Sequence, residues 1–347
     1  MEQLLRTRMT DEYGAVHPVV SAGMGFVAST PDLAIAVTNA GGIGSLGVAL
    51  LPVEATRMLI QAVRAATGGG PFNVNLITPY VLPGQIEVCA EEAVPIVSFH
   101  WGNPPRDTID RLHAAGCRVW EQVGSAEAAR RAVYSGVDLV VAQGSEAGGH
   151  NFGTMPTLAL VPAVVDAVAP APVVAAGGIG DGRGLAAVLA LGAVGAWVGT
   201  RFVATREANA HEAYKSRLIE AAGADTVRTS VLGPDMPGFN PYRVLRNSLI
   251  DEYEGREAEL PADLAGEPVI ASMAMGPQRI EIHRFSNFIP TPETEGDLSL
   301  MAMPAGEGVG LVRSVRGAAE VLEAMVREAA EVLRRIAPAP APGSGSA

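Results

Sequence analysis

A histidine at the end of a glycine-rich stretch is the strongest candidate for proton transfer in this sequence. His150 closes the stretch Gln143-Gly144-Ser145-Glu146-Ala147-Gly148-Gly149-His150, which follows an apolar run over 137–142. The glycines let the backbone approach a flat ligand closely. Imidazole, with an unperturbed pKa of about 6.5, suits a general base near neutral pH. His150 is therefore the catalytic candidate, and a structural role in the loop is the alternative.

Two other glycine-bearing stretches could bind a phosphate. Gly177-Gly178-Ile179-Gly180-Asp181-Gly182 and Gly199-Thr200-Arg201-Phe202 each follow an apolar run, and the first precedes a helical pattern. Backbone amides in such stretches converge on an anion, with a helix N-terminus behind them. The Thr200 hydroxyl would add a donor, and Arg201 would either neutralise the phosphate or pair with an acidic side chain. The expected ligand is a phosphorylated cofactor, with a plain turn as the alternative.

Polar and aromatic residues end two further apolar runs. Asn75 lies in Phe72-Asn73-Val74-Asn75-Leu76, while His100 and Trp101 lie in Ser98-Phe99-His100-Trp101-Gly102. Asn75 would present its amide to a ligand or cap the strand, and His100 and Trp101 would line a substrate pocket or close the end of the fold. The other histidines have no motif around them and are interpreted as surface or packing residues: His17, His113, His211 and His283.

Short β-rich runs alternate with helical patterns over the first 221 residues. We predict strands at 16–20, 43–48, 71–77, 94–99, 117–121, 137–142, 172–176 and 193–198. We predict helices at 31–40, 52–66, 84–92, 106–115, 126–134, 157–168, 184–191 and 208–221. Eight strand–helix pairs indicate an α/β fold, a (β/α)8 TIM barrel. Because barrel active sites lie at the carboxyl ends of the strands, the stretches above would meet there. A doubly wound sheet is the competing architecture.

The rest of the chain is predicted to form additions to this barrel. The barrel is assigned to 10–222, and an appended C-terminal lid or subdomain to 223–313, with a helical segment at 242–259. A final helix is expected at 314–336, capped by Ser314 and packing on the barrel. The tail at 337–347 alternates Ala and Pro before Gly and Ser, a composition typical of disorder.

Composition excludes several classes of protein. The 347 residues carry 25 basic and 37 acidic side chains, a formal charge of −12, which argues against binding of nucleic acid. The two cysteines, Cys89 and Cys117, are too few for a zinc site, and no metal is expected. They fit a reducing cytosol, and the absence of a long apolar run argues against a membrane span or signal peptide.

The common hydrolase, zinc-protease and kinase motifs are absent from the sequence. Gly42-Ile43-Gly44-Ser45-Leu46-Gly47 does match the dinucleotide-binding pattern G-x-G-x-x-G. It follows a predicted helix, however, and no acidic residue lies at Thr67, about 20 residues further on, as that fold requires. We interpret this stretch as a tight turn between a helix and a strand.

Taken together, these stretches resemble the FMN-dependent nitronate monooxygenases, once called 2-nitropropane dioxygenases. The resemblance covers residues 10–222 strongly and the rest weakly. Besides the stretches above, it includes Ser21-Ala22-Gly23-Met24-Gly25 and Asn39-Ala40-Gly41-Gly42-Ile43-Gly44. Ala305-Gly306-Glu307-Gly308-Val309-Gly310-Leu311 is similar to an element that the family places near the flavin, whereas the Pro-rich insert at 233–242 has no close match.

The resemblance implies a role for each site residue. Gly23 and Met24 would lie against the flavin ring, Asn75 would contact it, and Gln143 and Gly148 would hold the ring or the ribityl chain. His150 would be the catalytic residue over the flavin. The FMN phosphate would be bound by Gly177, Gly178, Gly199 and Thr200.

The resemblance implies oxidation of alkyl nitronates, or of nitroalkanes after deprotonation, with O2 to a carbonyl compound and nitrite. The related FMN-dependent enoyl-acyl-carrier-protein reductases and NADH:quinone reductases share nearly all the motifs, so an NAD(P)H-dependent reductase is the alternative. These reductases tend to carry an acid at the position of Gln143, which favours the monooxygenase. A flavin-free binding barrel is a third hypothesis. Expected partners are a small-molecule substrate and O2, and the chain could form a homodimer.

Overall fold

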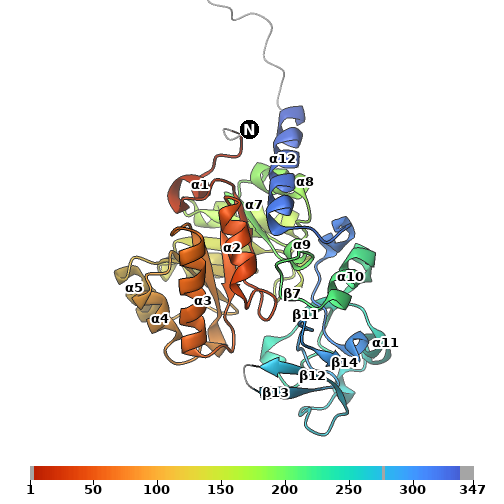
Figure 1. Cartoon of the computed structure of the whole chain (residues 1–347). Helices are drawn as coiled ribbons and strands as arrows, with labels where there is room; N and C mark the ends of the chain where they lie inside the picture. Colours follow the sequence, from red (N-terminus) through yellow and green to blue (C-terminus); the bar gives the residue numbers. More distant parts are fainter. Residues whose placement is uncertain (1–3, 276–277, 337–347) are drawn as a thin grey trace, which may run out of the picture.

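Eight parallel strands form the centre of the molecule in the computed structural model, which describes residues 4–275 and 278–336. Their order is β1-β9-β8-β6-β5-β4-β3-β2, and a parallel bridge between Val20 and Ile43 joins the two end strands. The strands are β1 (Val19–Ser21), β2 (Gly44–Gly47), β3 (Phe72–Ile77), β4 (Ile96–His100), β5 (Arg118–Val123), β6 (Leu139–Gln143), β8 (Val173–Ala176) and β9 (Gly195–Val198). The predicted (β/α)8 barrel is confirmed (Figure 1), and each predicted strand overlaps one of these.

Helices follow the barrel strands and cover their outer face (Figure 1). They are α2 (Pro31–Asn39), α3 (Val53–Ala66), α4 (Gln85–Glu91), α5 (Arg106–Ala114), α6 (Ala126–Tyr134), α7 (Thr157–Val168), α8 (Gly182–Ala190) and α10 (Glu212–Glu220). Local sequence sets several starts: Pro31 occupies the first turn of α2, and Ser125 and Asp181 accept backbone N–H groups at the starts of α6 and α8. The starts of these three helices thus follow from residues that the sequence shows.

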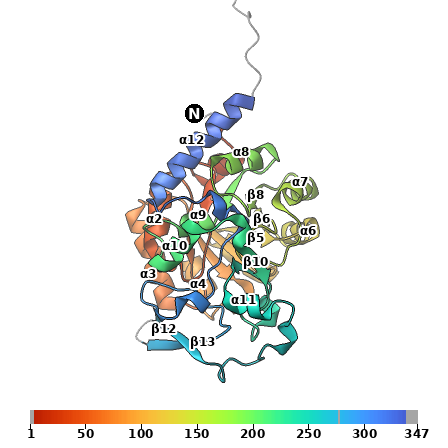
Figure 2. The same cartoon turned by 90° about the vertical axis from the view of Figure 1, so that its right-hand side faces the viewer.

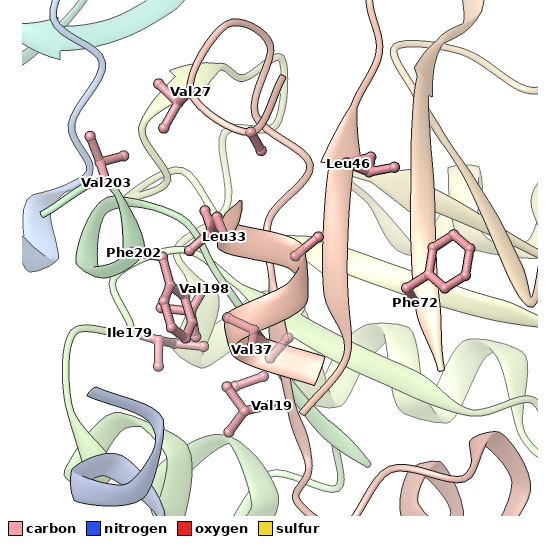
Figure 3. Close-up of a cluster of buried hydrophobic side chains, with 14 of the residues drawn as sticks. Val19, Val27, Leu33, Val37, Leu46, Phe72, Ile179, Val198, Phe202 and Val203 are labelled. Carbon is pink, nitrogen blue, oxygen red and sulfur yellow. The ribbon is translucent and has the colours of Figure 1, made fainter. Parts of the chain in front are cut away.

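Two hydrophobic layers hold the barrel together. The inner layer fills the barrel with residues such as Ile43, Trp120 and Trp197, and α1 (Arg8–Tyr13) closes its amino end, where the Tyr13 ring packs edge-on against Trp120 at 5.0 Å. The outer layer lies between strands and helices, where Leu33 and Phe202 are fully buried (Figure 3). Burial on both faces explains why the strands lack polar alternation.

The C-terminal helix α12 (Ala318–Ile336) packs on the barrel against α8 and α2 (Figure 2). A Cβ atom on Gly182 would lie 2.3 Å from the Met325 oxygen, so α8 and α12 are in close contact. The predicted start at Ser314 is wrong by four residues, because Arg316 is extended and forms a bridge with Thr205. The tail predicted to be disordered, 337–347, lies outside the described residues.

The region between α10 and α12 contains more strand than helix. Strands β10 (Thr226–Thr229), β11 (Tyr242–Leu245) and β7 (Gly149–His150) form one antiparallel sheet, and β12 (Val269–Met275), β13 (Gln278–His283) and β14 (Glu295–Gly296) form another. The helix predicted over 242–259 is therefore wrong at its start: β11 comes first, and α11 (Ser248–Tyr253) begins after Asn247, whose side chain accepts the Ile250 N–H.

Neither a membrane span nor a metal cluster is found among residues 4–275 and 278–336. No helix there is both long and apolar enough to cross a membrane. No group of three or more His, Cys, Asp or Glu side chains there could hold a metal ion.

Candidate active site at the carboxyl ends of the barrel strands

One pocket at the carboxyl ends of the barrel strands collects nearly all the residues that the sequence singled out. Its lining includes the predicted catalytic His150 and the predicted pocket residue His100. The lining also includes every predicted cofactor-binding residue: Gly23, Met24, Asn75, Gln143, Gly148, Gly177, Gly178, Gly199 and Thr200. Segments distant in the sequence thus converge because parallel strands present their carboxyl ends on one side of a barrel.

One end of the pocket has the groups that a phosphate needs. Gly177 and Gly178 have φ values of +103° and +72°, a conformation that glycine adopts freely, and they lead into the N-terminus of α8. Across from them, Thr200 begins α9 (Thr200–Val203), and its Oγ1 accepts the Gly306 N–H at 3.0 Å. The Thr200 O–H therefore stays available to donate. Two helix N-termini and a hydroxyl donor fit the phosphate of FMN.

The middle of the pocket fits a flat ring system. Gly23 lies against Asn75 so closely that a Cβ atom on Gly23 would be 2.1 Å from the Asn75 Cβ. The Asn75 Nδ2 donates to Ser98 Oγ at 2.8 Å, which leaves Oδ1 to accept a hydrogen bond from a ligand. Gly148 also allows a close approach of two segments, since a Cβ atom there would lie 2.5 Å from the Gly306 nitrogen. Any side chain at these glycines would displace the pocket wall.

Arg201 lines the pocket and pairs with no acidic side chain among the described ion pairs, while its role in neutralising a phosphate stays a prediction. Its guanidinium is buried and donates to the Ser314 and Ala204 carbonyl oxygens, with no carboxylate partner among the described ion pairs. Burial, with the nearby Arg316 charge, lowers the pKa of Arg201 to about 10, so it remains cationic at neutral pH. The side chain ties α9 to the segment that leads into α12.

His150 is held in one orientation by the appended region. Strand β7 pairs with β11, which places the His150 ring between Phe239 and Tyr242, at centroid distances of 3.5 and 4.1 Å. The His150 Nδ1 lies 2.5 Å from the Phe239 carbonyl oxygen. Because a carbonyl can only accept, Nδ1 must carry the proton in the neutral ring. Nε2 is thus the nitrogen left with a lone pair.

Burial keeps both pocket histidines uncharged. It lowers the pKa of His150 to about 3, His100 adds to this effect, and the Phe239 carbonyl opposes it. Burial also lowers the pKa of His100 to about 4, and its Nδ1 has no hydrogen-bond partner among the described residues. At neutral pH both rings are therefore neutral, and His150 Nε2 carries a free lone pair.

Trp101 lies one layer behind the pocket instead of in its lining. Its Nε1 donates to the Gly238 carbonyl at 2.6 Å, and its ring packs edge-on against Phe239 and Phe152 at 5.0 and 4.9 Å. The indole therefore fixes the segment that carries Phe239. Trp101 was predicted to line the substrate pocket; it supports the pocket wall through Gly238 and Phe239 instead.

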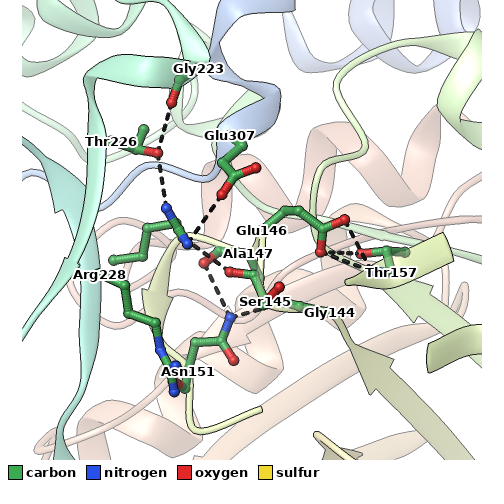
Figure 4. A network of polar contacts seen from close by, with 11 residues as sticks. Gly144, Ser145, Glu146, Ala147, Asn151, Thr157, Gly223, Thr226, Arg228 and Glu307 are labelled. Atoms are coloured by element: carbon green, nitrogen blue, oxygen red, sulfur yellow. Dashed lines mark hydrogen bonds and ion pairs between the residues drawn. The ribbon is translucent and has the colours of Figure 1, made fainter. Parts of the chain in front are cut away.

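A polar network anchors the loop that leads to His150 (Figure 4). Asn151 Nδ2 donates to the Gly144 oxygen, and Glu146 accepts the backbone and hydroxyl protons of Thr157 at the start of α7. Arg243 on β11 donates to the Ser145 oxygen and pairs with Glu307. These contacts join the loop to the barrel, to β11 and to the segment before α12.

Sequence reasoning missed several residues of the pocket. Phe239, Tyr242 and Ile289 come from the appended region, and Gln122 comes from β5. The Pro- and Gly-rich stretch around Phe239 shows a turn, but no local pattern indicates that it folds back over His150. Its place depends on the pairing of β11 with the two residues of β7.

Comparison with known proteins agrees with this geometry. The family model described as "Nitronate monooxygenase" matches residues 6–83 and 80–328. A nitronate monooxygenase of Pseudomonas aeruginosa is 34% identical over 92% of this chain and 99% of its own. A (3aS,4S,5R,7aS)-5-hydroxy-7a-methyl-1-oxo-octahydro-1H-indene-4-carboxyl-CoA dehydrogenase of Mycobacterium tuberculosis is 40% identical over 72% of this chain and 69% of its own. The solved structure of a nitroalkane oxidase from Streptomyces ansochromogenes superposes with a TM-score of 0.77 at 29% identity, covering 95% of this chain and 99% of the other.

Proposed function

The chain belongs to the nitronate monooxygenase family and is an oxidoreductase, and on this premise we propose that it uses FMN and O2 to oxidise alkyl nitronates, formed where needed from nitroalkanes, to a carbonyl compound and nitrite. The observation that carries the proposal is the orientation of His150. Its Nδ1 donates to the Phe239 carbonyl, so that Nε2 would be the proton acceptor. The same pocket contains the glycines predicted to hold the cofactor, Gly23, Gly148, Gly177, Gly178 and Gly199.

The residues of the chain would bind the cofactor and move one proton. Gly177, Gly178, Gly199 and Thr200 would hold the phosphate, and Gly23, Asn75 and Gly148 would enclose the ring. His150 Nε2 would take the proton from the carbon that bears the nitro group, and the Phe239 carbonyl would stabilise the imidazolium through Nδ1–H. Bound FMN would supply the redox chemistry, accepting electrons from the nitronate and passing them to O2.

A second candidate function is a flavin-dependent dehydrogenase or reductase that acts on a thioester or a quinone. The 40% identity to the carboxyl-CoA dehydrogenase favours it. In that reaction His150 would donate a proton or bind the carbonyl oxygen of the acceptor. The two functions differ in the source of electrons, a nitronate in the first and a thioester substrate or NAD(P)H in the second.

Replacement of His150 tests the proposal. We expect His150→Gln to keep FMN and to lower kcat/KM for neutral nitroalkanes by about 10²–10⁴-fold, the usual contribution of a general base. Nitrite release and flavin content measure the two effects. The control is His283→Gln, because His283 lies on β13 and is not part of the pocket lining. Full nitroalkane turnover by His150→Gln would refute the assignment.

A further inference from the structure

His150 lies in a pocket wall without a carboxylate. Among the described residues that line the pocket, none is an aspartate or a glutamate. A catalytic histidine is commonly oriented by a carboxylate, which also stabilises the imidazolium that forms when the ring accepts a proton. Burial lowers the pKa of His150 to about 3, so an imidazolium there needs stabilisation from another source.

Two aromatic rings lie against the His150 ring. The Phe239 ring is stacked on it at a centroid distance of 3.5 Å and an interplanar angle of 28°, and the Tyr242 ring at 4.1 Å and 14°. Phe239 and Tyr242 make no ring contact with each other among the described aromatic pairs, as expected for rings on opposite faces of the imidazole. Burial raises the pKa of the Tyr242 phenol, so this ring stays neutral. Both rings therefore present to His150 the π face that attracts a cation.

The two rings are themselves fixed by their surroundings. Phe239 packs edge-on against Tyr80 and Trp101 at 5.2 and 5.0 Å, and Trp101 Nε1 donates to the neighbouring Gly238 carbonyl. Tyr242 is buried on β11 and pairs directly with His150 on β7. The His150 ring therefore cannot turn without displacing a ring that is held from elsewhere.

Both rings come from the Pro-rich insert at 233–242, which no family motif explains. From these contacts we propose that Phe239 and Tyr242 are positioning residues for proton transfer. They hold His150 with Nδ1 at the Phe239 carbonyl, and their π faces stabilise the imidazolium that forms at Nε2. In that step the C–H bond of the nitroalkane breaks, its electron pair stays on the nitronate and the proton goes to Nε2. This inference rests on the proposed function, since it concerns proton transfer at the same site.

A pair of substrates separates this role from a merely structural one. 1-Nitropropane must lose a proton before oxidation, whereas propyl-1-nitronate has already lost it. For FMN-loaded Tyr242→Leu we expect kcat for nitrite release from 1-nitropropane to fall about tenfold, and kcat for propyl-1-nitronate to stay within about twofold of wild type. Equal losses for the two substrates would overturn the inference, because the ring would then act only on the shape of the pocket.

Three further variants show which part of each residue acts. Tyr242→Phe keeps the ring, so we expect it to recover the wild-type ratio of the two kcat values, and a ratio like that of Tyr242→Leu would refute a role for the ring. Phe239→Leu keeps the carbonyl that accepts Nδ1–H, so a fall in the ratio isolates the ring, and an unchanged ratio would refute its role. The matched control is Tyr253→Leu on α11, whose ring packs on Phe285 outside the pocket lining and whose loss should leave the ratio unchanged.

Nitrogen-15 NMR of histidine-labelled protein tests the positioning without turnover. The His150 signals are assigned by their absence in His150→Gln. We expect wild type to show one neutral tautomer at neutral pH, with the proton on Nδ1, and Tyr242→Leu to show a mixture of both. If Tyr242→Leu does not fold, Phe239→Leu serves for both measurements.

The NMR result also separates this inference from the proposed function. A single Nδ1–H tautomer in the wild type and in both leucine variants would overturn the positioning role, whether or not nitrite is released. Loss of the single tautomer in the variants, with no nitrite from either substrate in wild type, would refute the proposed reaction and support the role of the two rings.

Discussion

At the scale of single residues, burial sets the protonation of groups that differ in charge type. His100 and His150 become neutral because a buried imidazolium lacks hydration, and their pKa values fall to about 4 and 3. Glu121 on β5 becomes neutral for the same reason, because burial raises its pKa to about 8 and its Oε2 has no partner among the described residues. The histidines face the pocket, whereas Glu121 is not part of the pocket lining.

Ionisation of Glu121 therefore lowers the stability of the folded protein as the pH rises, and a neutral residue at this position would remove that loss. The pKa of Glu121 in the folded protein is about 8, above its usual value of 4.5. Its contribution to the free energy of unfolding is therefore fully present below about pH 4.5 and is lost as the pH rises through 8. We expect Glu121→Gln to be more stable than wild type, with the difference growing by about 3 kcal/mol between pH 5 and pH 8. Urea unfolding at the two pH values measures it.

The matched control is Glu127→Gln on α6, whose side chain is 81% exposed. Its effect should stay within about 0.5 kcal/mol at both pH values, as for most surface substitutions. If the Glu121→Gln difference does not grow with pH, the Glu121 carboxyl is ionised at both pH values and burial does not raise its pKa.

Much of the site could be predicted from residue types, because its glycines and its histidine lie in short stretches that are recognisable in the sequence. Gly177, Gly178 and Gly148 predicted a close approach of the backbone to a ligand, and His150 was predicted to lie beside them; all four residues line the pocket. The neutral state of His150 could not be predicted, because it depends on Phe239 and Tyr242, which lie 89 and 92 residues further along the chain.

At the scale of elements, a small antiparallel sheet aligns the loop that carries His150. Strand β11 pairs with β10 on one side and with the two residues of β7 on the other. Arg243 on β11 joins the sheet to the barrel loop through the Ser145 oxygen, and it also donates to Thr226 Oγ1. The same strand therefore stacks Tyr242 on His150 and ties down the loop before it.

Arg243 should matter far more than the carboxylate it pairs with. The Arg243 side chain is 11% exposed, while its partner Glu307 is 48% exposed. We expect Arg243→Met to destabilise the protein by about 2 kcal/mol and to weaken FMN retention, because the Ser145 carbonyl and the Thr226 hydroxyl lose their donor. Glu307→Gln should cost less than about 1 kcal/mol, as for an exposed ion pair.

Urea unfolding and the flavin content of the purified variants measure both effects. Equal losses for Arg243→Met and Glu307→Gln would show that the ion pair, and not the contacts to Ser145 and Thr226, holds the loop.

Elements of the barrel could be predicted well because each has its own sequence signals. Pro31, Ser125 and Asp181 mark helix starts, and the β-branched runs mark strands buried on both faces. The prediction failed at 242–245, where a short strand was read as the start of a helix. Such a strand depends on distant partners, the two residues of β7 and the four of β10.

At the scale of the whole molecule, the appended region and α12 attach to different parts of the barrel. The appended region lies over the pocket end and contributes Phe239, Tyr242 and Ile289 to its wall, of which Tyr242 lies on β11. Helix α12 packs on α8 and α2 at the side of the barrel (Figure 2), where the Gly182 N–H donates to Glu328. The barrel thus supplies the glycine-rich loops of the pocket, while the appended region forms part of the wall over them.

This division explains which part of the function the sequence predicts. The family model matches most of the chain, and a carboxyl-CoA dehydrogenase is 40% identical over 72% of this chain, so similarity alone does not fix the reaction. We expect the reaction to depend also on Phe239, Tyr242 and Ile289, which line the pocket and come from segments without a motif. A direct measurement of the electron donor is therefore the decisive test.

That measurement is the visible absorbance of the flavin in purified protein after anaerobic mixing with propyl-1-nitronate, with NADH in a parallel cell. We predict rapid loss of the oxidised flavin absorbance with the nitronate and none with NADH. Bleaching by NADH together with no response to the nitronate would contradict nitronate oxidation and would favour a reductase that acts on a thioester or a quinone.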